Sequence, residues 1–177
     1  MSSGVRRRSS VTSEADFFRS IAARKVVRPR VAGIVIRDGQ LLAQRPTDDP
    51  QASYALVGGE YEVGDTFMSR LQAEIEEETS AHLVSARYLF VIENRFIYKA
   101  AFIHGLEHYL LAEIDRSDVE SREPHLEVYW LPVDQISNYD LRPHVVRDAI
   151  ASGKYLDVRH LVVPFEQDRS LESGSAE

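Results

Sequence analysis

The stretch that decides the fold is Val57-Gly-Gly-Glu-Tyr-Glu-Val-Gly-Asp-Thr-Phe-Met-Ser-Arg-Leu-Gln-Ala-Glu-Ile-Glu-Glu-Glu-Thr79. Its first part is rich in glycine, and Gly58, Gly59 and Gly64 allow tight turns and a close approach of the backbone to a ligand. Its second part has the apolar spacing of an amphipathic helix, which we expect over 66–79. The stretch therefore predicts a glycine-rich loop that leads directly into a helix.

The predicted helix gathers carboxylates on one side. At about 100° per residue, Glu74, Glu77 and Glu78 converge on one flank, and Glu78 enters the apolar stripe. That stripe consists of Phe67, Met68, Leu71 and Ile75. Three like charges at this spacing weaken a helix, so a divalent cation would stabilise it, and carboxylate oxygens favour Mg²⁺, Mn²⁺ or Ca²⁺ over soft metals. A solvated acidic face is the alternative interpretation, and the glycine loop directly before the helix favours the metal site.

Strand-like runs and turns surround this stretch. Strands are expected at 31–36, 40–45, 54–57, 83–92, 96–103, 107–114 and 127–131. Asp38-Gly39 predicts a two-residue hairpin between the first two strands. A second helix is expected over 141–152, with Gly153 as its stop. These elements predict one α+β domain with a mixed, largely antiparallel sheet.

Composition narrows the class of protein. The chain has 177 residues, which is the size of one ordinary globular domain. It has no cysteine, which excludes disulfide scaffolds, thiolate zinc sites and thiol nucleophiles. No uncharged run approaches the roughly 18 residues of a membrane span, and no apolar stretch follows the basic residues near the start. A cytoplasmic protein without membrane contact is therefore expected.

Charge is distributed unevenly along the chain. Residues 1–30 hold eight basic and two acidic residues, a net charge of +6, so the remaining residues carry −13 of the total of −7. We expect a basic, flexible arm over 1–28 with a short helix starting near Ser13, a folded domain over 29–164 and a flexible tail over 165–177. The acidic body repels nucleic acid, so a nucleic-acid partner is not expected.

The glycine loop and helix together resemble the signature of the Nudix hydrolase family, G-x5-E-x7-R-E-U-x-E-E-x-G-U, where U is apolar. On this chain the pattern runs from Gly59 to Ala81 and is called the Nudix box below. The likeness covers roughly residues 30–150, and it implies a Nudix-type α/β/α sandwich with the box helix packed on the sheet. The chain departs from the pattern at Asp65, Ala73 and Ser80, where the family has Glu, Arg and Gly.

The resemblance implies metal-dependent hydrolysis of a phosphoanhydride in a nucleoside diphosphate linked to another moiety. Glu74, Glu77, Glu78 and the Gly59 carbonyl would then hold Mg²⁺ or Mn²⁺, and Glu77 or Glu78 would serve as the catalytic carboxylate. Glutamates outside the box are alternative general bases: Glu107, Glu123 and Glu127.

Two arginines are candidates for further roles in such an enzyme. Arg45 ends the second strand and, by resemblance, would bind a substrate phosphate. Arg70 lies between Glu74 and Glu77 on the helix, so its guanidinium could take over from the arginine missing at Ala73 or bind substrate. A strand-end solvated charge for Arg45 and an ordinary surface ion pair for Arg70 are the alternatives.

Other functions stay open at this point. Ala73 and Ser80 leave room for a Nudix-fold module that binds a nucleotide or a partner with weak or no turnover. The basic arm leaves room for an RNA-associated version. Homodimers are common in the family, so a homodimer is expected by resemblance.

Overall fold

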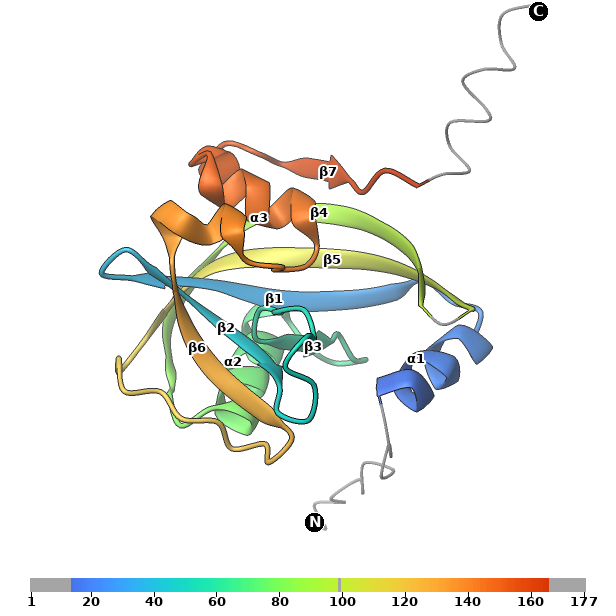
Figure 1. Cartoon of the computed structure of the whole chain (residues 1–177), viewed down its shortest axis with the longest axis horizontal. Coiled ribbons are helices and arrows are strands. Elements are labelled where there is room, and N and C mark those ends of the chain that lie inside the picture. The colour runs from blue at the N-terminus through green and yellow to red at the C-terminus, as the bar shows by residue number, and fades with distance from the viewer. Residues whose placement is uncertain (1–13, 99, 166–177) are drawn as a thin grey trace, which may run out of the picture.

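One mixed sheet of seven strands forms the centre of the computed structural model, and helices cover both of its faces (Figure 1). The structure describes residues 14–98 and 100–165. In chain order the elements are α1 (Glu14–Ala23), β1 (Arg28–Arg37), β2 (Gln40–Pro46), β3 (Gly58–Glu60), α2 (Phe67–Glu78), β4 (Leu83–Tyr98), β5 (Ala101–Ile114), β6 (Leu126–Pro132), η1 (Val133–Asn138), α3 (His144–Ala151), η2 (Lys154–Leu156) and β7 (His160–Val162). The strand order is β6-β2-β1-β5-β4-β7, and the short β3 pairs with β1.

Two hydrophobic cores lie on opposite faces of this sheet. The first joins α2 to the sheet through Val31, Val35, Leu42, Leu71, Ile75 and Leu110. The second joins α3 and η1 to the other face through Ile34, Leu41, Phe90, Ile136, Val146 and Ile150. Side chains alternate between the two faces along each strand, which is why both cores draw on the same strands. The fold is an α+β sandwich of α/β/α type, which confirms the predicted class.

Strand directions in the sheet are mixed. β1 pairs with β5 and β4 with β7 in parallel, whereas the other ladders are antiparallel. The β1–β2 turn has positive φ angles at Asp38 (50°) and Gly39 (73°), as a two-residue hairpin with a type I′ turn requires. The hairpin predicted from these two residues is confirmed.

Four of the expected strands have other boundaries in the structure. The runs expected at 83–92, 96–103 and 107–114 are two long strands, β4 and β5, because polar residues at their centre are paired inside the sheet rather than placed in a turn. Asn94 is buried there and donates a hydrogen bond to Glu107. The strand expected over 54–57 makes only isolated bridges, and the ladder to β1 begins at Gly58 instead.

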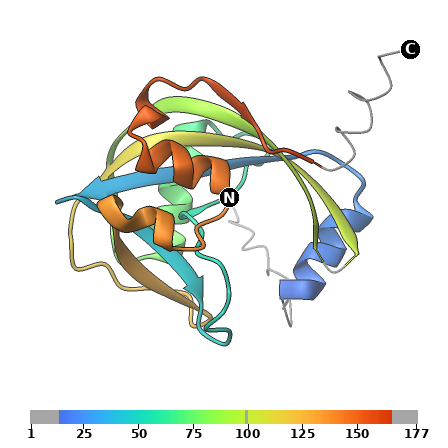
Figure 2. The same cartoon turned by 45° about the horizontal axis from the view of Figure 1, so that its top comes forward.

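The N-terminal helix α1 lies at the far end of the β4–β5 hairpin, away from α3 (Figures 1 and 2). Its Ile21 is buried against Ala101 and Ile103, and Phe18 packs edge-to-face on Phe96 with ring centroids 5.7 Å apart. This part of the predicted flexible arm is therefore packed on the sheet, because α1 has an apolar side to bury. The rest of the predicted arm, residues 1–13, and residues 166–177 of the predicted tail lie outside the described residues. Among the described helices, none is long and apolar enough to cross a membrane.

Candidate active site at the glycine loop and helix α2

Helix α2 begins where its sequence provides a cap. The Thr66 side chain accepts a hydrogen bond from the Ser69 backbone N–H (3.0 Å), and Ser69 Oγ accepts one from the Thr66 N–H (2.8 Å). This reciprocal pair satisfies two N–H groups that the first helical turn leaves free. Leu71 and Ile75 are completely buried against the sheet, whereas Met68, predicted to join them, is 42% exposed because it lies at the edge of the stripe.

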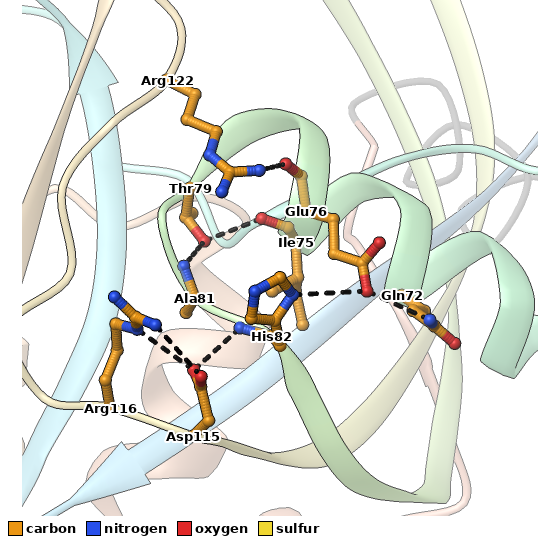
Figure 3. A network of polar contacts seen from close by, with 9 residues as sticks. All are labelled: Gln72, Ile75, Glu76, Thr79, Ala81, His82, Asp115, Arg116 and Arg122. Atoms are coloured by element: carbon orange, nitrogen blue, oxygen red, sulfur yellow. Dashed lines mark hydrogen bonds and ion pairs between the residues drawn. The ribbon is translucent and has the colours of Figure 1, made fainter.

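The other end of α2 is closed by side chains and by the loop before β6 (Figure 3). Thr79 Oγ1 donates to the Ile75 carbonyl (2.7 Å) and accepts from the Ala81 N–H (3.1 Å). Arg122 Nη1 donates to the Glu76 carbonyl (2.6 Å), and the Arg122 backbone N–H donates to the Glu78 carbonyl (2.9 Å). The last carbonyls of the helix, which have no partner within it, are satisfied in this way.

This closure explains why Ser80 can stand where the family pattern has glycine. Thr79 ends the helix in an extended conformation, with φ at −133°, so the chain needs no left-handed residue to leave the helix. The Ser80 N–H donates to the Glu120 carbonyl (2.8 Å), and Ser80 Oγ accepts from the Glu120 N–H (2.9 Å). The serine therefore ties the helix end to the loop that supplies Arg122.

The three carboxylates of α2 differ in burial. Glu74 and Glu78 are buried, with 3% and 9% exposure, whereas Glu77 is exposed. Arg70, one turn earlier, forms an ion pair with Glu74, and its Nη2 lies 3.6 Å from Glu77 Oε2. The guanidinium thus lies between two of the box carboxylates, as its place on the helix predicts.

Glu78 is held differently from Glu74, by neutral donors. Gln44 Nε2, from β2, donates to Glu78 Oε2 (2.9 Å), and the Gly58 backbone also hydrogen-bonds this carboxylate. Burial, and then the charge of Glu74, raise the pKa of Glu78 to about 7. A carboxylate with such a pKa changes its charge near neutral pH and is strongly stabilised by any added cation.

The glycine pair brings the backbone against these carboxylates. A Cβ at Gly58 would collide with the Val31 carbonyl, and a Cβ at Gly59 would collide with the Glu74 carboxylate. Only glycine therefore lets β3 pair with β1 while α2 packs on top of it. The half-buried backbone of Gly59 lies directly beside Glu74, where the sequence predicts a metal ligand.

The donor set fits a hard divalent cation in its chemistry. Glu74 and Glu78 supply buried carboxylate oxygens beside a glycine backbone, and Glu78 is held by neutral donors. Over residues 14–98 and 100–165, however, no three acidic or histidine side chains already converge as a metal site. Glu74 is turned to Arg70 and Glu78 to Gln44, so both carboxylates would have to turn to share an ion.

Arg45 lies away from this group. Gln44 and Arg45 are consecutive in β2, so their side chains point to opposite faces of the sheet. The Arg45 guanidinium lies over the rings of Tyr54 (4.9 Å) and Tyr129 (5.0 Å), and it donates to the Tyr129 hydroxyl (3.0 Å) and the Pro50 carbonyl (3.1 Å). The structure thus places Arg45 in an aromatic cluster on the α3 side of the sheet.

The three alternative general bases lie in different surroundings. Glu107 is 6% exposed on β5, and its two oxygens accept from Asn94 and Tyr109 (both 2.8 Å). Glu127 is exposed on β6 and accepts from the Tyr129 hydroxyl. Glu123 lies in the segment next to Arg122, whose backbone contacts the last turn of α2.

Sequence reasoning did not single out three residues that contact the box. Gln44 and Arg122 contact Glu78, and Arg30 of β1 donates to the Gly58 carbonyl (2.9 Å). Gln44 follows an apolar run in β2, which is the signal that could have shown it as a buried polar group with a partner, whereas Arg30 comes before the expected strand, at the end of the basic segment. Arg122 lies in a charged loop that carries no comparable signal.

Comparison with known proteins now assigns the family. A family model that describes the NUDIX domain matches residues 27–151. The chain belongs to the NUDIX family. The match contains every element that positions the box, from β1 to α3. Among curated proteins, no sequence matches this NUDIX chain.

Solved structures similar to this NUDIX protein carry the same fold. A MutT NUDIX hydrolase from Burkholderia pseudomallei is 26% identical over 71% of this chain and 96% of its own, with a TM-score of 0.56. A MutT protein from Bacillus halodurans is 14% identical over 76% of this chain and 86% of its own, with a TM-score of 0.61. A NUDIX hydrolase from Nitrosomonas europaea is 13% identical over 76% and 93%, with a TM-score of 0.59. The last two likenesses concern the fold alone.

Proposed function

We propose that this NUDIX protein hydrolyses a phosphoanhydride in a nucleoside diphosphate linked to another moiety, with Mg²⁺ or Mn²⁺ bound at the box. The observation that carries the proposal is the pair of buried carboxylates, Glu74 and Glu78, against the backbone of Gly58 and Gly59. Glu74 is paired with Arg70, whereas Glu78 accepts from neutral donors, so a divalent cation would neutralise charge at this pair that the hydrogen bonds do not.

The residues of the box have distinct roles in this proposal. Glu74, Glu77, Glu78 and the Gly59 carbonyl would hold the ion, which supplies charge neutralisation at the phosphates and a water of lowered pKa. Glu77 is the exposed carboxylate of the three and can accept a proton from water at the mouth of the site. Glu78 has a pKa raised to about 7 by burial and by the charge of Glu74, so an added cation would favour its ionised form.

Arg70 supports these carboxylates in place of the arginine that the family pattern has at Ala73. It pairs with Glu74 and approaches Glu77, and its side chain is only 10% exposed. This burial favours an orienting role over direct contact with a substrate. Arg45 remains a candidate for substrate binding at the aromatic cluster on the α3 side, where Tyr54 and Tyr129 offer ring faces.

A nucleotide panel tests the proposal. The panel is incubated with the native protein and Mg²⁺ or Mn²⁺, and the products are identified by mass. Glu78→Gln should lose the activity, whereas Glu76→Gln, on the same helix turn but paired with Gln72 at the surface, should keep it. Equal activity in the native protein and Glu78→Gln would remove Glu78 from the mechanism.

The buried Arg70–Glu74 pair also supports a second candidate, a NUDIX module that binds nucleotide without turnover. In that case the guanidinium would stay in the place of the metal, and the panel would show tight nucleotide binding without metal-dependent products. The same experiment therefore separates the two functions.

A further inference from the structure

Arg30 connects the centre of the sheet to the glycine loop. Its Nη2 donates to the Gly58 carbonyl (2.9 Å) and lies 3.5 Å from the Leu56 carbonyl, so one guanidinium reaches both sides of Val57. Gly58 is the residue whose backbone also hydrogen-bonds Glu78. The position of Gly58 relative to Glu78 therefore depends on where Arg30 holds it.

Glu107 lies beside Arg30 in the sheet. The two residues are direct partners in the parallel β1–β5 ladder, so their side chains lie on the same face. Asn94 and Tyr109 each donate to one oxygen of Glu107 (2.8 Å), which fixes its carboxylate. Gly105 leaves room for this arrangement, since a Cβ there would lie only 3.3 Å from Glu107 Oε1.

Charge balance links Arg30 to both groups of carboxylates. Burial disfavours the charged guanidinium, but Glu107 first, then Tyr109, Glu78 and Glu74 outweigh that cost, so the pKa of Arg30 is raised. Arg30 is therefore a permanent cation between a fixed carboxylate in the sheet and the two buried carboxylates of the box.

We propose that Arg30 and Glu107 are positioning residues that hold the glycine loop against Glu78 and Glu74. Glu107 attracts Arg30 electrostatically across the β1–β5 ladder, and Arg30 donates to the peptide carbonyls on both sides of Val57. This assignment rests on the proposed hydrolase function for its effect on turnover, but its structural part does not. It also excludes Glu107 as the general base, because both of its oxygens are engaged and the side chain is buried.

Hydrogen–deuterium exchange of the metal-free protein tests the structural part without any substrate. Arg30→Met should raise amide exchange over residues 56–60 at least about tenfold, because the loop loses its side-chain anchor. Arg30→Lys, which keeps the charge and one donor, should restore most of the protection. Arg37→Met is the matched control, since Arg37 also lies on β1 and donates to a carbonyl, that of Ile114 (2.8 Å), away from the box.

Amide exchange over 56–60 in the two variants decides whether Arg30 holds the glycine loop. Faster exchange over 56–60 in Arg30→Met but not in Arg37→Met supports the proposal. Unchanged exchange over 56–60 in an Arg30→Met protein that melts cooperatively would overturn it. If Arg30→Met does not fold, Arg30→Lys decides, with a smaller but measurable rise expected over 56–60 and none at the β1–β2 hairpin.

Kinetics on whichever panel nucleotide the native protein hydrolyses fastest test the functional part. Arg30→Lys should lower kcat about tenfold with KM within about twofold, because small displacements of catalytic groups slow chemistry more than binding. Glu107→Gln should cost less than about tenfold and leave the shape of the pH profile unchanged, whereas loss of a general base costs about 10² to 10⁴ and removes one limb.

The control for Glu107→Gln is Glu113→Gln, on the same strand but exposed and paired with Ser85. A loss of 10²-fold or more in Glu107→Gln, with a limb of the profile removed, would overturn the positioning role. If the native protein hydrolyses nothing, the proposed hydrolase function fails, but the exchange experiment still decides whether Arg30 holds the loop.

Discussion

Glu78 and Glu107 are two equally buried glutamates with opposite surroundings. Glu78 accepts from one amide donor and a backbone donor, and burial and the charge of Glu74 outweigh the attraction of Arg30, so its pKa is raised to about 7. Glu107 has a donor on each oxygen and Arg30 beside it in the sheet. Burial alone therefore does not mark a reactive carboxylate; a buried carboxylate left short of positive charge does.

The largest expected effect is the difference in hydrolytic activity between Glu78→Gln and Glu107→Gln. Glu78→Gln should reduce hydrolysis of the best panel nucleotide by at least about 10²-fold, because it removes a negative charge that the ion and the water both require. Glu107→Gln should lose less than about tenfold. Steady-state kinetics at saturating Mg²⁺ measures both, and equal losses in the two variants would break the comparison.

The pH dependence of stability separates the same two residues. Glu78 binds its proton more tightly in the folded than in the unfolded protein, since its pKa is about 7 instead of 4.5. Between these two values the folded state therefore holds the extra proton, and the free energy of unfolding should fall as pH rises. The expected loss by pH 8 is on the order of 3 kcal/mol in the metal-free protein.

Urea unfolding at a series of pH values checks this slope. Glu78→Gln should abolish the fall between pH 4.5 and 7, whereas Glu107→Gln should retain it. Mg²⁺ should reduce the slope in the native protein, because a cation at the box favours the ionised carboxylate. A slope that survives in Glu78→Gln would assign it to another group.

Replacing Arg70 tests how much of the negative charge of the box carboxylates this guanidinium neutralises. Arg70→Met should lower the free energy of unfolding at neutral pH by about 2 kcal/mol, because Glu74 then stays buried without a countercharge. Mg²⁺ should stabilise this variant more than the native protein. Arg116→Met, which breaks a surface pair with Asp115, should change stability by less than about 0.5 kcal/mol.

Thermal unfolding with and without Mg²⁺ in excess over the protein gives the measurement, because an ion that binds only the folded state raises its stability. Equal Mg²⁺ stabilisation of Arg70→Met and the native protein would show that the guanidinium and the ion do not compete for the same carboxylates.

Local patterns in the sequence were sufficient to predict the helix of the box and the hairpin beside it. The apolar period of the helix and the turn at Asp38-Gly39 act over a few residues, so they predict α2 and the β1–β2 hairpin with small errors. The second helix was predicted to start at Leu141, but α3 starts at His144, directly after Pro143. Pro143 cannot continue a helix from earlier residues because it has no N–H to donate.

The sequence did not predict which polar side chains from distant strands would contact one another. Asn94 lies in the gap between two expected strands and Glu107 at the start of the next one, and only the β4–β5 register places the two side chains together. Arg30 looks like the end of a basic arm until the parallel ladder sets it beside Glu107 and under the glycine loop. Which polar side chains of a strand find partners depends on strand order, and strand order is decided by the whole core.

The smallest expected effect concerns the end of α2 that bears Glu78. Arg122→Met should lower the free energy of unfolding by about 1 kcal/mol, because the Glu76 carbonyl loses a charged donor at the helix end. Exchange of the amides at 79–81 should rise, while 103–109 around Glu107 should stay protected. If exchange rose equally at 79–81 and 103–109, the end of α2 and the strand around Glu107 would unfold together as one cooperative unit. Glu78 and Glu107 would then differ in their electrostatic surroundings but not in local stability.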